Sequence, residues 1–330
     1  MKIAITGGAG FVGSHIAKAY LDAGHDVLIV DNLTSGSRQA LDPRARFYAL
    51  DIRDSRLLDV LSQERPDVVS HHAVQRPSGL PAEWALRDAD VHIRGLLNVL
   101  EACVTASVRK VIFASGGDSL YGIIPMVGAD IHIAKEDATL CPSTPFDISK
   151  VSGEAYVRYF AQQYGFDYTI LRYASIYGET DDAKAQHPVT HCISMLAENR
   201  RPTLRGSIHE VRDHIFIDDV ARANLLALTR GRNSTLHISS GQGYSLHQFF
   251  CAVAQYFQSD LLPIHVSDTL VGPAACILDN TLARQELGWK PEIGLSEGIR
   301  LTIERMPGVM KRDEQEKDTV SEQVLQAVFA

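Results

Sequence analysis

Short apolar runs alternate with amphipathic segments along the first half of the chain. The runs of strand length are Lys2–Thr6, Val27–Asp31, Arg46–Leu50, Asp67–His71, Lys110–Ser115 and Tyr168–Arg172. Apolar positions at helical spacing lie between them at Phe11–Ala23, Ser55–Gln63, Glu83–Ala106 and Ile148–Tyr164. This alternation predicts an α/β fold, a Rossmann-type doubly wound parallel sheet that is covered by helices on both faces.

The pattern changes after Gly178, where the segments become shorter and richer in Gly and Pro. A strand at Asp213–Ile217 and a helix at Asp218–Leu228 then resume the earlier alternation. We therefore predict a second, smaller domain, a discontinuous C-terminal α/β substrate domain. The expected division is 1–172 and about 213–240 for the Rossmann domain and about 173–212 and 241–310 for the second domain, with a charged tail at 311–330.

Composition narrows the class of partner. The formal net charge of −8 disfavours nucleic acid as a partner, because affinity for phosphate backbones depends on clustered Lys and Arg. No apolar run reaches the ~18 residues that span a bilayer, and no signal-peptide pattern opens the sequence, so no membrane partner is expected. Five widely spaced cysteines without a CxxC pair favour free thiols and a cytoplasmic location.

A glycine-rich loop, TGGAGFVG at Thr6–Gly13, follows the first predicted strand and opens the first predicted helix. In that context the glycines allow a tight turn, a close approach of the backbone to a pyrophosphate, and close packing of the helix on the strand. The helix N-terminus offers free amides and a partial positive charge to the phosphates. The loop residues expected to contact a dinucleotide are Gly7, Gly10, Phe11, Val12 and Gly13.

Acidic residues at the ends of the next two strands favour NAD over NADP. Asp31 closes the second strand, where a carboxylate accepts the ribose hydroxyls and repels a 2′-phosphate. Asp51 and Ile52 follow the third strand and are placed to meet the adenine edge, although a surface turn is the alternative interpretation of Asp51. The other expected cofactor contacts are Asn32, His72, Ala73, Gln75 and Lys150.

Further motifs follow in order. They are DNLTSG at Asp31–Gly36, DIRD at Asp51–Asp54, HHAVQ at His71–Gln75, VIFASGGDSLYG at Val111–Gly122, LRYASIYG at Leu171–Gly178, RDHIFIDDVARA at Arg212–Ala223 and ELGWKP at Glu286–Pro291. With the glycine loop, the series resembles the extended short-chain dehydrogenases/reductases, in particular the nucleotide-sugar epimerases and dehydratases. The resemblance implies NAD on the first domain, a nucleotide-diphosphate sugar in the cleft under the second, and a homodimer formed through helices 83–106 and 148–164.

The resemblance also implies a Tyr and a Lys at positions i and i+4 of one helix, where the ammonium lowers the pKa of the phenol and the phenolate takes a proton from the sugar. Lys150 matches that Lys, but Phe146 stands at the Tyr position. A phenyl ring cannot exchange a proton. Because Gly116, Ser175 and His92 also differ from the family pattern, natural divergence is favoured over a single engineered change.

Other groups are candidates for the missing chemistry. Asp118 matches an acid of related dehydratases, with a turn residue as the alternative interpretation, and Ser115 and Ser119 are placed to orient a carbonyl or hydroxyl. The candidate catalytic positions are Lys150, Phe146 as the place of the missing Tyr, Ser115, Asp118 and Ser119.

Substrate contacts are expected from Arg76, Ser175, Tyr177 and Arg212. The resemblance implies that Arg212 binds the diphosphate, and an ion pair with Asp213 is the alternative. His187 and His191 have the spacing of some zinc ligands, but without an evident third ligand no metal is predicted.

The leading hypothesis is therefore an NAD-dependent epimerase/dehydratase-like enzyme that acts on a nucleotide-diphosphate sugar by transient hydride transfer. One alternative is a divergent reductase, dehydratase or lyase of specialised metabolism that lacks the Tyr. The other is a catalytically impaired NAD-binding or sensor protein.

Overall fold

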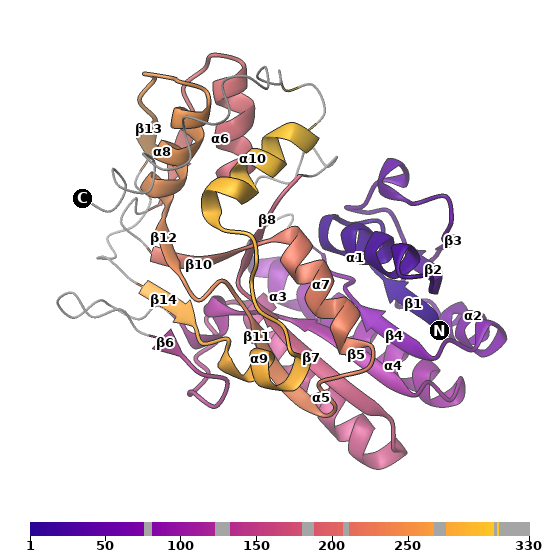
Figure 1. Ribbon diagram of the computed structural model, residues 1–330. Helices are drawn as coiled ribbons and strands as arrows, with labels where there is room; N and C mark the ends of the chain where they lie inside the picture. Colours follow the sequence, from indigo (N-terminus) through magenta and orange to yellow (C-terminus); the bar gives the residue numbers. More distant parts are fainter. Residues whose placement is uncertain are drawn as a thin grey trace.

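A seven-stranded parallel sheet forms the centre of the first half of the protein (Figure 1). The computed structural model describes residues 1–75, 81–122, 133–179, 188–206, 211–266, 275–306 and 309. Across the sheet the strands are β3 (Arg46–Ala49), β2 (Asp26–Asp31), β1 (Lys2–Thr6), β4 (Val68–His71), β5 (Lys110–Ser115), β7 (Asp167–Tyr173) and β11 (Ser234–Ile238). The predicted doubly wound parallel sheet is confirmed, and the six predicted strands lie in it.

Helices cover both faces of this sheet and bury a separate core on each. On one face α1 (Phe11–Asp22) packs with α7 (Ile217–Ala227). The other carries α2 (Arg56–Glu64), α4 (Gly95–Thr105) and α5 (Pro145–Tyr164). Alternate residues of β1 enter opposite cores, Ile3 and Ile5 on the side of α1 and Ala4 on the side of α2. Burial on both faces explains why these strands are continuous apolar runs.

The helix expected at Glu83–Ala106 is interrupted. It consists of α3 (Pro81–Ala89), a π-helical turn η2 (Asp90–Arg94) and α4. The wider turn brings the consecutive residues Val91 and His92 both into the interior, which a regular amphipathic helix with one buried stripe does not favour.

The helix α5 begins three residues before the predicted Ile148. Thr144 accepts a hydrogen bond from the Asp147 amide, the Asp147 carboxylate accepts one in return from the Thr144 amide, and Pro145 occupies the first turn. This capping box fixes the helix start. The left-handed Gly165 ends the helix.

The second half of the chain builds smaller sheets and a group of helices at the end of the molecule away from α2 (Figure 1). A five-stranded sheet contains β12 (Gly243–Ser245), β10 (Val211–Phe216), β14 (Ala275–Leu278), β6 (Ile133–Ala134) and β8 (Ser175–Tyr177); β13 (Ile264–Val266) pairs with β9 (Thr203–Arg205). The helices at that end are α6 (Pro188–Ala197), α8 (Leu246–Tyr256) and α10 (Leu295–Arg305), whereas α9 (Thr281–Leu287) packs against β11 and α7. Short 3₁₀ turns, η1 (Arg38–Ala40) and η3 (Asp118–Tyr121), lie earlier in the chain.

The chain crosses between the two parts more than once. The β10 strand belongs to the five-stranded sheet, whereas β11, which follows α7, returns to the seven-stranded sheet. The predicted strand at Asp213–Ile217 therefore exists, but it pairs with β8, β12 and β14. The division into two domains stays a prediction.

Arg76, His187 and the predicted tail at 311–330 lie outside the described residues. In the described part of the chain, no helix combines the length and the apolar character needed to cross a membrane. All five cysteines are free thiols. The cytoplasmic location stays a prediction.

Candidate active site

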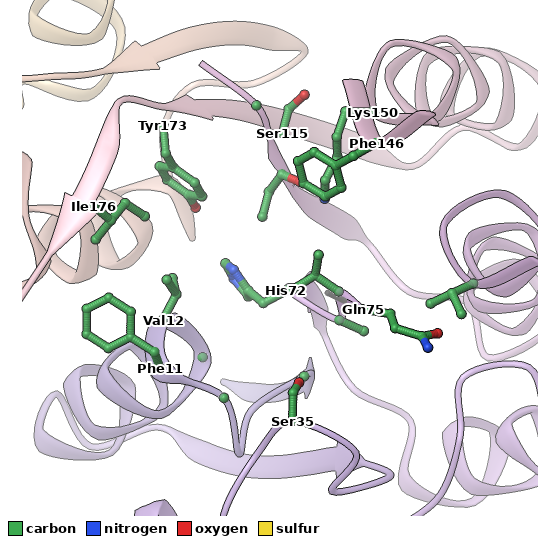
Figure 2. Close-up of a pocket in the computed structure, with 18 of the residues that line it drawn as sticks. Phe11, Val12, Ser35, His72, Gln75, Ser115, Phe146, Lys150, Tyr173 and Ile176 are labelled. Atoms are coloured by element: carbon green, nitrogen blue, oxygen red, sulfur yellow. The ribbon is translucent and has the colours of Figure 1, made fainter. Parts of the chain in front are cut away.

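A cavity of about 520 Å³ opens at the carboxyl ends of β1, β2, β4 and β5 (Figure 2). Loops that follow parallel strands converge at this edge of a sheet, which is where such folds bind ligands. Most predicted site residues line it: Gly7, Gly10, Phe11, Val12, Gly13, Asp31, Asn32, Asp51, Ile52, His72, Ala73, Gln75, Ser115, Asp118, Ser119, Phe146, Lys150, Ser175 and Arg212. The structure thus brings the predicted cofactor and catalytic sets into one cavity.

Two predicted substrate residues are not among the lining. Tyr177 is 2% exposed, and its ring packs edge-on against Phe216 and Phe249. Its hydroxyl end meets α10 at Gly298, where an added Cβ would lie 2.1 Å from the phenol oxygen. Tyr177 therefore sits in the core between β8, α8 and α10. The prediction for Arg76 falls outside the described residues.

The glycine loop forms a cradle that larger residues would fill. Gly7 has a φ of +75°, and an added Cβ would lie 2.5 Å from the Ala73 nitrogen. At Gly13 an added Cβ would lie 2.2 Å from the Gly7 carbonyl oxygen. Gly10 is the N-cap of α1 and provides no side-chain cap, so the amides of the first turn remain available to an anion.

The Asp31 carboxylate is fixed at the end of β2. It is 8% exposed, and its two oxygens accept hydrogen bonds from the Ala9 amide (3.0 Å) and the Leu33 amide (2.7 Å). These bonds hold an acidic group beside the glycine loop, where it would meet a ribose.

Asp51 is held by neighbours on the same side of the cavity. Its oxygens accept from the Arg53 guanidinium, at 2.8 and 2.7 Å, and from the Asn32 amide group at 2.7 Å. The guanidinium keeps the pKa of Asp51 well below its usual range. The charge of Asp51 is therefore already balanced, and its contact with an adenine stays a prediction.

His72, the residue after β4, lines the cavity and contains a buried polar atom without a partner among the described residues. His72 Nε2 is 2.8 Å from Ser70 Oγ, while Nδ1 is buried without a hydrogen-bond partner among the described residues. Burial lowers the pKa of His72 to about 3, so the ring is neutral at physiological pH. Figure 2 shows this ring directed into the cavity. A buried polar atom without a partner is costly, which favours a ligand there.

His92 ties the cofactor side of the cavity to α5. Its Nε2 accepts from the Gln75 amide at 3.1 Å, so the neutral ring carries its hydrogen on Nδ1, which lies 2.9 Å from Asp88 Oδ2. The ring also meets Phe146 edge-on, with 5.4 Å between centroids. Two positions that differ from the family pattern are therefore in contact. The sequence marked His92 only as a difference, because its partners are distant in the chain.

Lys150 lies at the other end of the cavity, on α5 next to Phe146 (Figure 2). Its Nζ donates to the Ala114 carbonyl oxygen at 2.7 Å and lies over the rings of Phe113 and Phe146, 5.1 and 5.4 Å from their centroids. Burial lowers the pKa of Lys150 to about 8. An ammonium that sheds its proton near neutral pH therefore stands beside a ring without a hydroxyl.

The Ser115 hydroxyl belongs to an interior network. It donates to Glu154 Oε1 at 2.7 Å, and Glu154 Oε2 pairs with Arg172 at 2.8 Å. Glu154 and Arg172 are both buried. In Figure 2 the Ser115 oxygen lies on the side away from the Phe146 ring. The hydroxyl proton is thus engaged by a carboxylate and is not directed toward a reacting group.

Asp118 of η3 and Arg212 of β10 form an ion pair in the wall of the cavity. Asp118 Oδ2 is 3.3 Å from Arg212 Nη1. The sequence offered Asp213 as the partner of Arg212, but Asp213 is buried and accepts from Ser240 and Gly241. Burial raises the pKa of Asp213 to about 7. A neighbouring guanidinium favours the charged form of a carboxylate, so the geometry suits Asp118 to orienting Arg212 better than to donating a proton.

Several lining residues were not predicted: Val30, Thr34, Ser35, Leu50, Arg53, Val74, Val91, Ala114, Gly116, Gly117, Tyr173, Ala174 and Ile176. Most of them lie inside the motifs of the sequence analysis. They would have been predicted if every residue of each motif, and not only selected positions, had been assigned to the site. Val91 follows from the π turn instead. Of the two histidines with zinc-like spacing, His191 accepts a hydrogen bond at Nε2 from the Thr203 amide at 3.2 Å, and His187 lies outside the described residues.

Comparison with known proteins identifies the family of this chain and similar proteins. The family described as "NAD dependent epimerase/dehydratase family" matches residues 3–239. The putative UDP-glucose 4-epimerase of Methanocaldococcus jannaschii is 33% identical, over 92% of this chain and 98% of its own length. The UDP-glucose 4-epimerase of Mycolicibacterium smegmatis is 31% identical with the same coverage.

Solved structures of proteins named as UDP-glucose 4-epimerases also have the same fold as this chain. The UDP-glucose 4-epimerase of Thermotoga maritima with UDP-glucose superposes with a TM-score of 0.86 at 35% identity. The Thermus thermophilus enzyme in complex with NAD gives 0.84 at 31% identity. Each alignment covers 92% of this chain and 98% of the other.

Proposed function

Because this chain belongs to the NAD-dependent epimerase/dehydratase family, we propose that it oxidises and re-reduces a nucleotide-diphosphate sugar by transient hydride transfer. NAD is the cofactor of the family, and bound NAD supplies a reversible hydride acceptor. The observation that carries the proposal is the single cavity that runs from the glycine loop to Lys150 and Arg212. The relatives named as UDP-glucose 4-epimerases support this substrate class.

The residues divide the work between two ligands. The α1 N-terminus and the glycine cradle would hold the pyrophosphate of NAD, and Asp31 would hold its adenosine ribose. The neutral His72 ring would line the same pocket. Lys150 would also meet the nicotinamide ribose. On the substrate side we assign the diphosphate to Arg212 and sugar hydroxyls to Ser119 and Ser175, which line the same cavity.

The first experiment separates cofactor binding from substrate binding. The purified chain is titrated with NAD by calorimetry, and the NAD-loaded protein is then incubated with UDP-glucose and a panel of other nucleotide sugars. We expect NAD binding, an absorbance at 340 nm after sugar addition, and an epimerised product by NMR. Arg212→Ala should weaken only the sugar, and Arg200→Ala, on the surface next to Glu198, is the control. NAD binding without any response to the panel would rule out this substrate class.

A second candidate function is NAD binding without turnover. The specific observation in its favour is Phe146, which leaves no phenol above Lys150. Turnover of any sugar at an ordinary enzymatic rate would exclude it. A reductase, dehydratase or lyase that uses Asp118 as an acid is less favoured because Arg212 pairs with that carboxylate.

We also propose that the chain forms a homodimer through the helices of residues 83–106 and 145–164. Large apolar side chains lie exposed on them: Leu86 is 79% exposed, Ile148 53% and Tyr159 54%. Exposed apolar groups gathered on packed helices are typical of an interface. Light scattering should give a dimer for the wild type and a monomer for Tyr159→Glu combined with Leu86→Glu. A monomeric wild type at micromolar concentration would contradict the proposal.

A further inference from the structure

We propose that Lys150 itself exchanges the proton of the reacting sugar hydroxyl, in place of the phenol that Phe146 lacks. The inference rests on the proposed function and adds the identity of the acid/base group. It starts from position: Lys150 lines the cavity at its catalytic end, and its Nζ lies 5.4 Å from the centroid of the Phe146 ring. Because Phe146 carries no phenol oxygen, the proposal places the reacting hydroxyl on the cavity side of the amine, in contact with Nζ directly or through one water.

The contacts of Nζ leave it free to exchange protons. One hydrogen is committed to the Ala114 carbonyl oxygen at 2.7 Å. Nζ also lies over the aromatic faces of Phe113 and Phe146, which stabilise the ammonium but take no proton. Deprotonation therefore breaks no ion pair. Burial favours the neutral amine and brings the pKa to about 8, so both protonation states are populated near neutral pH.

The other titratable groups of the cavity are less suited. The Tyr173 phenol has a raised pKa because it is buried, and its hydroxyl donates to Asn224 at 3.1 Å. His72, with a pKa of about 3, is too weak a base. Asp51 and Asp118 are paired with the guanidinium groups of Arg53 and Arg212.

The charges around Lys150 come from four elements. His71 and His72 at the end of β4 have pKa values lowered by burial, and the charge of Lys150 lowers them further. The same holds for His92 in η2. Two carboxylates favour the ammonium, Asp88 on α3 and Glu154 on α5, but they are engaged by His92 and by Arg172. Burial is the largest influence on the pKa of the amine. The charge of Glu154 is balanced by Arg172, whereas the charge of Asp88 faces a neutral imidazole and still favours the ammonium.

The step balances without another reactant. The neutral amine takes the proton of the sugar hydroxyl while the attached carbon loses a hydride to the cofactor, which gives a ketone and an ammonium. After the ketone presents its other face, the hydride returns to that carbon and the ammonium returns the proton to the oxygen. The enzyme and cofactor end as they began.

Lysine NMR tests the amine without turnover. In protein labelled with ¹⁵N-lysine, the Lys150 Nζ signal, assigned by its absence in Lys150→Arg, should titrate near pH 8 and shift when NAD is added. Lys110 is the matched control, because burial also lowers its pKa to about 8 while its Nζ donates to the Arg230 carbonyl oxygen away from the cavity. Its signal should not respond to NAD. A Lys150 signal that titrates near the ordinary value of about 10.4 overturns the inference.

A double-mutant cycle tests the role in turnover. Wild-type kcat should rise with pH through about 8, because the first step needs the neutral amine. Lys150→Arg, which keeps the charge but not the titration, should lower kcat by about 100-fold or more. In the Phe146→Tyr background, where a phenol can act, the same change should cost about tenfold less.

The outcomes separate the two claims. If wild type and Phe146→Tyr both convert no sugar, the proposed function fails and the inference fails with it. If the wild type turns over and Lys150→Arg matches its rate and pH profile, the inference alone fails.

Discussion

The two ends of the cavity differ in whether backbone or side-chain groups form them. The cofactor end is shaped mainly by backbone amides and glycine Cα atoms, with the fixed carboxylate of Asp31 beside them. The other end depends on particular functional groups, and there Phe146 lacks a hydroxyl while that of Ser115 is engaged by Glu154. A site shaped by the backbone tolerates most side-chain changes and depends on a few glycines, whereas a site made by side-chain chemistry changes whenever one functional group is replaced. The same fold can thus keep its cofactor site while the groups for proton transfer change.

The largest effect is expected at the cofactor end. In Gly13→Val the added Cβ alone would lie 2.2 Å from the Gly7 carbonyl oxygen. The backbone of the pyrophosphate cradle must therefore move apart to make room for the side chain. We expect NAD affinity to fall by about 100-fold or more, measured by calorimetry, since close backbone approach is lost. Gly294→Ala is the control, because an added Cβ there meets nothing within 4 Å. Unchanged NAD affinity in Gly13→Val would contradict the claim that the shape of the glycine loop forms the cofactor end of the cavity.

Acid should weaken the fold through the histidines of the cofactor end. The folded pKa of His72, about 3, lies below its ordinary value of 6.5, so the unfolded chain binds more protons below pH 6.5. The unfolding free energy contributed by His72 is present above pH 6.5 and falls by about 1.4 kcal/mol per pH unit as acid is added.

Urea unfolding at pH 7 and pH 5 measures this loss. His72→Asn should lose about 2 kcal/mol less than the wild type over that interval. Equal losses in the two proteins would show that His72 is not held neutral.

The ion pair at the far end separates binding from acid catalysis. Arg212→Ala should raise the KM for a nucleotide sugar by about tenfold or more, because a charge-assisted contact to the diphosphate is lost. Asp118→Asn, which removes the ion pair with Arg212, should change kcat by about threefold at most if Lys150 moves the proton. A 100-fold fall in kcat for Asp118→Asn would instead make Asp118 the acid.

The smallest effect concerns the start of α5, which carries both Phe146 and Lys150. Thr144→Ala removes the capping box and should cost about 1 kcal/mol of unfolding free energy, with a modest fall in turnover. Ser245→Ala removes the equivalent box of α8, outside the cavity, at a similar cost in stability. Turnover should stay at the wild-type level in Ser245→Ala, and an equal fall in both variants would show that α5 does not position the site.

The sequence predicts most of the first half because its signals are local. The predicted strands Lys2–Thr6 and Lys110–Ser115 have the same bounds as β1 and β5. The spacing of glycines in the loop predicts the cradle directly. What it cannot supply are pairings between distant segments. The contact of Arg212 with Asp118, the capture of Ser115 by Glu154 and the anchoring of Gln75 by His92 each join residues from different elements. The π turn at Asp90–Arg94 is also invisible, since periodicity extends smoothly across it.

The central claim is that a carbon-bound hydride leaves the sugar and returns to it within one cavity. Turnover of the responsive nucleotide sugar in D₂O, followed by NMR of the product, tests this most directly. A hydride held by the cofactor does not exchange with solvent, whereas the hydroxyl proton that passes through Lys150 does. We predict an inverted product with no deuterium on carbon, and deuterium at the reacting carbon would contradict the account.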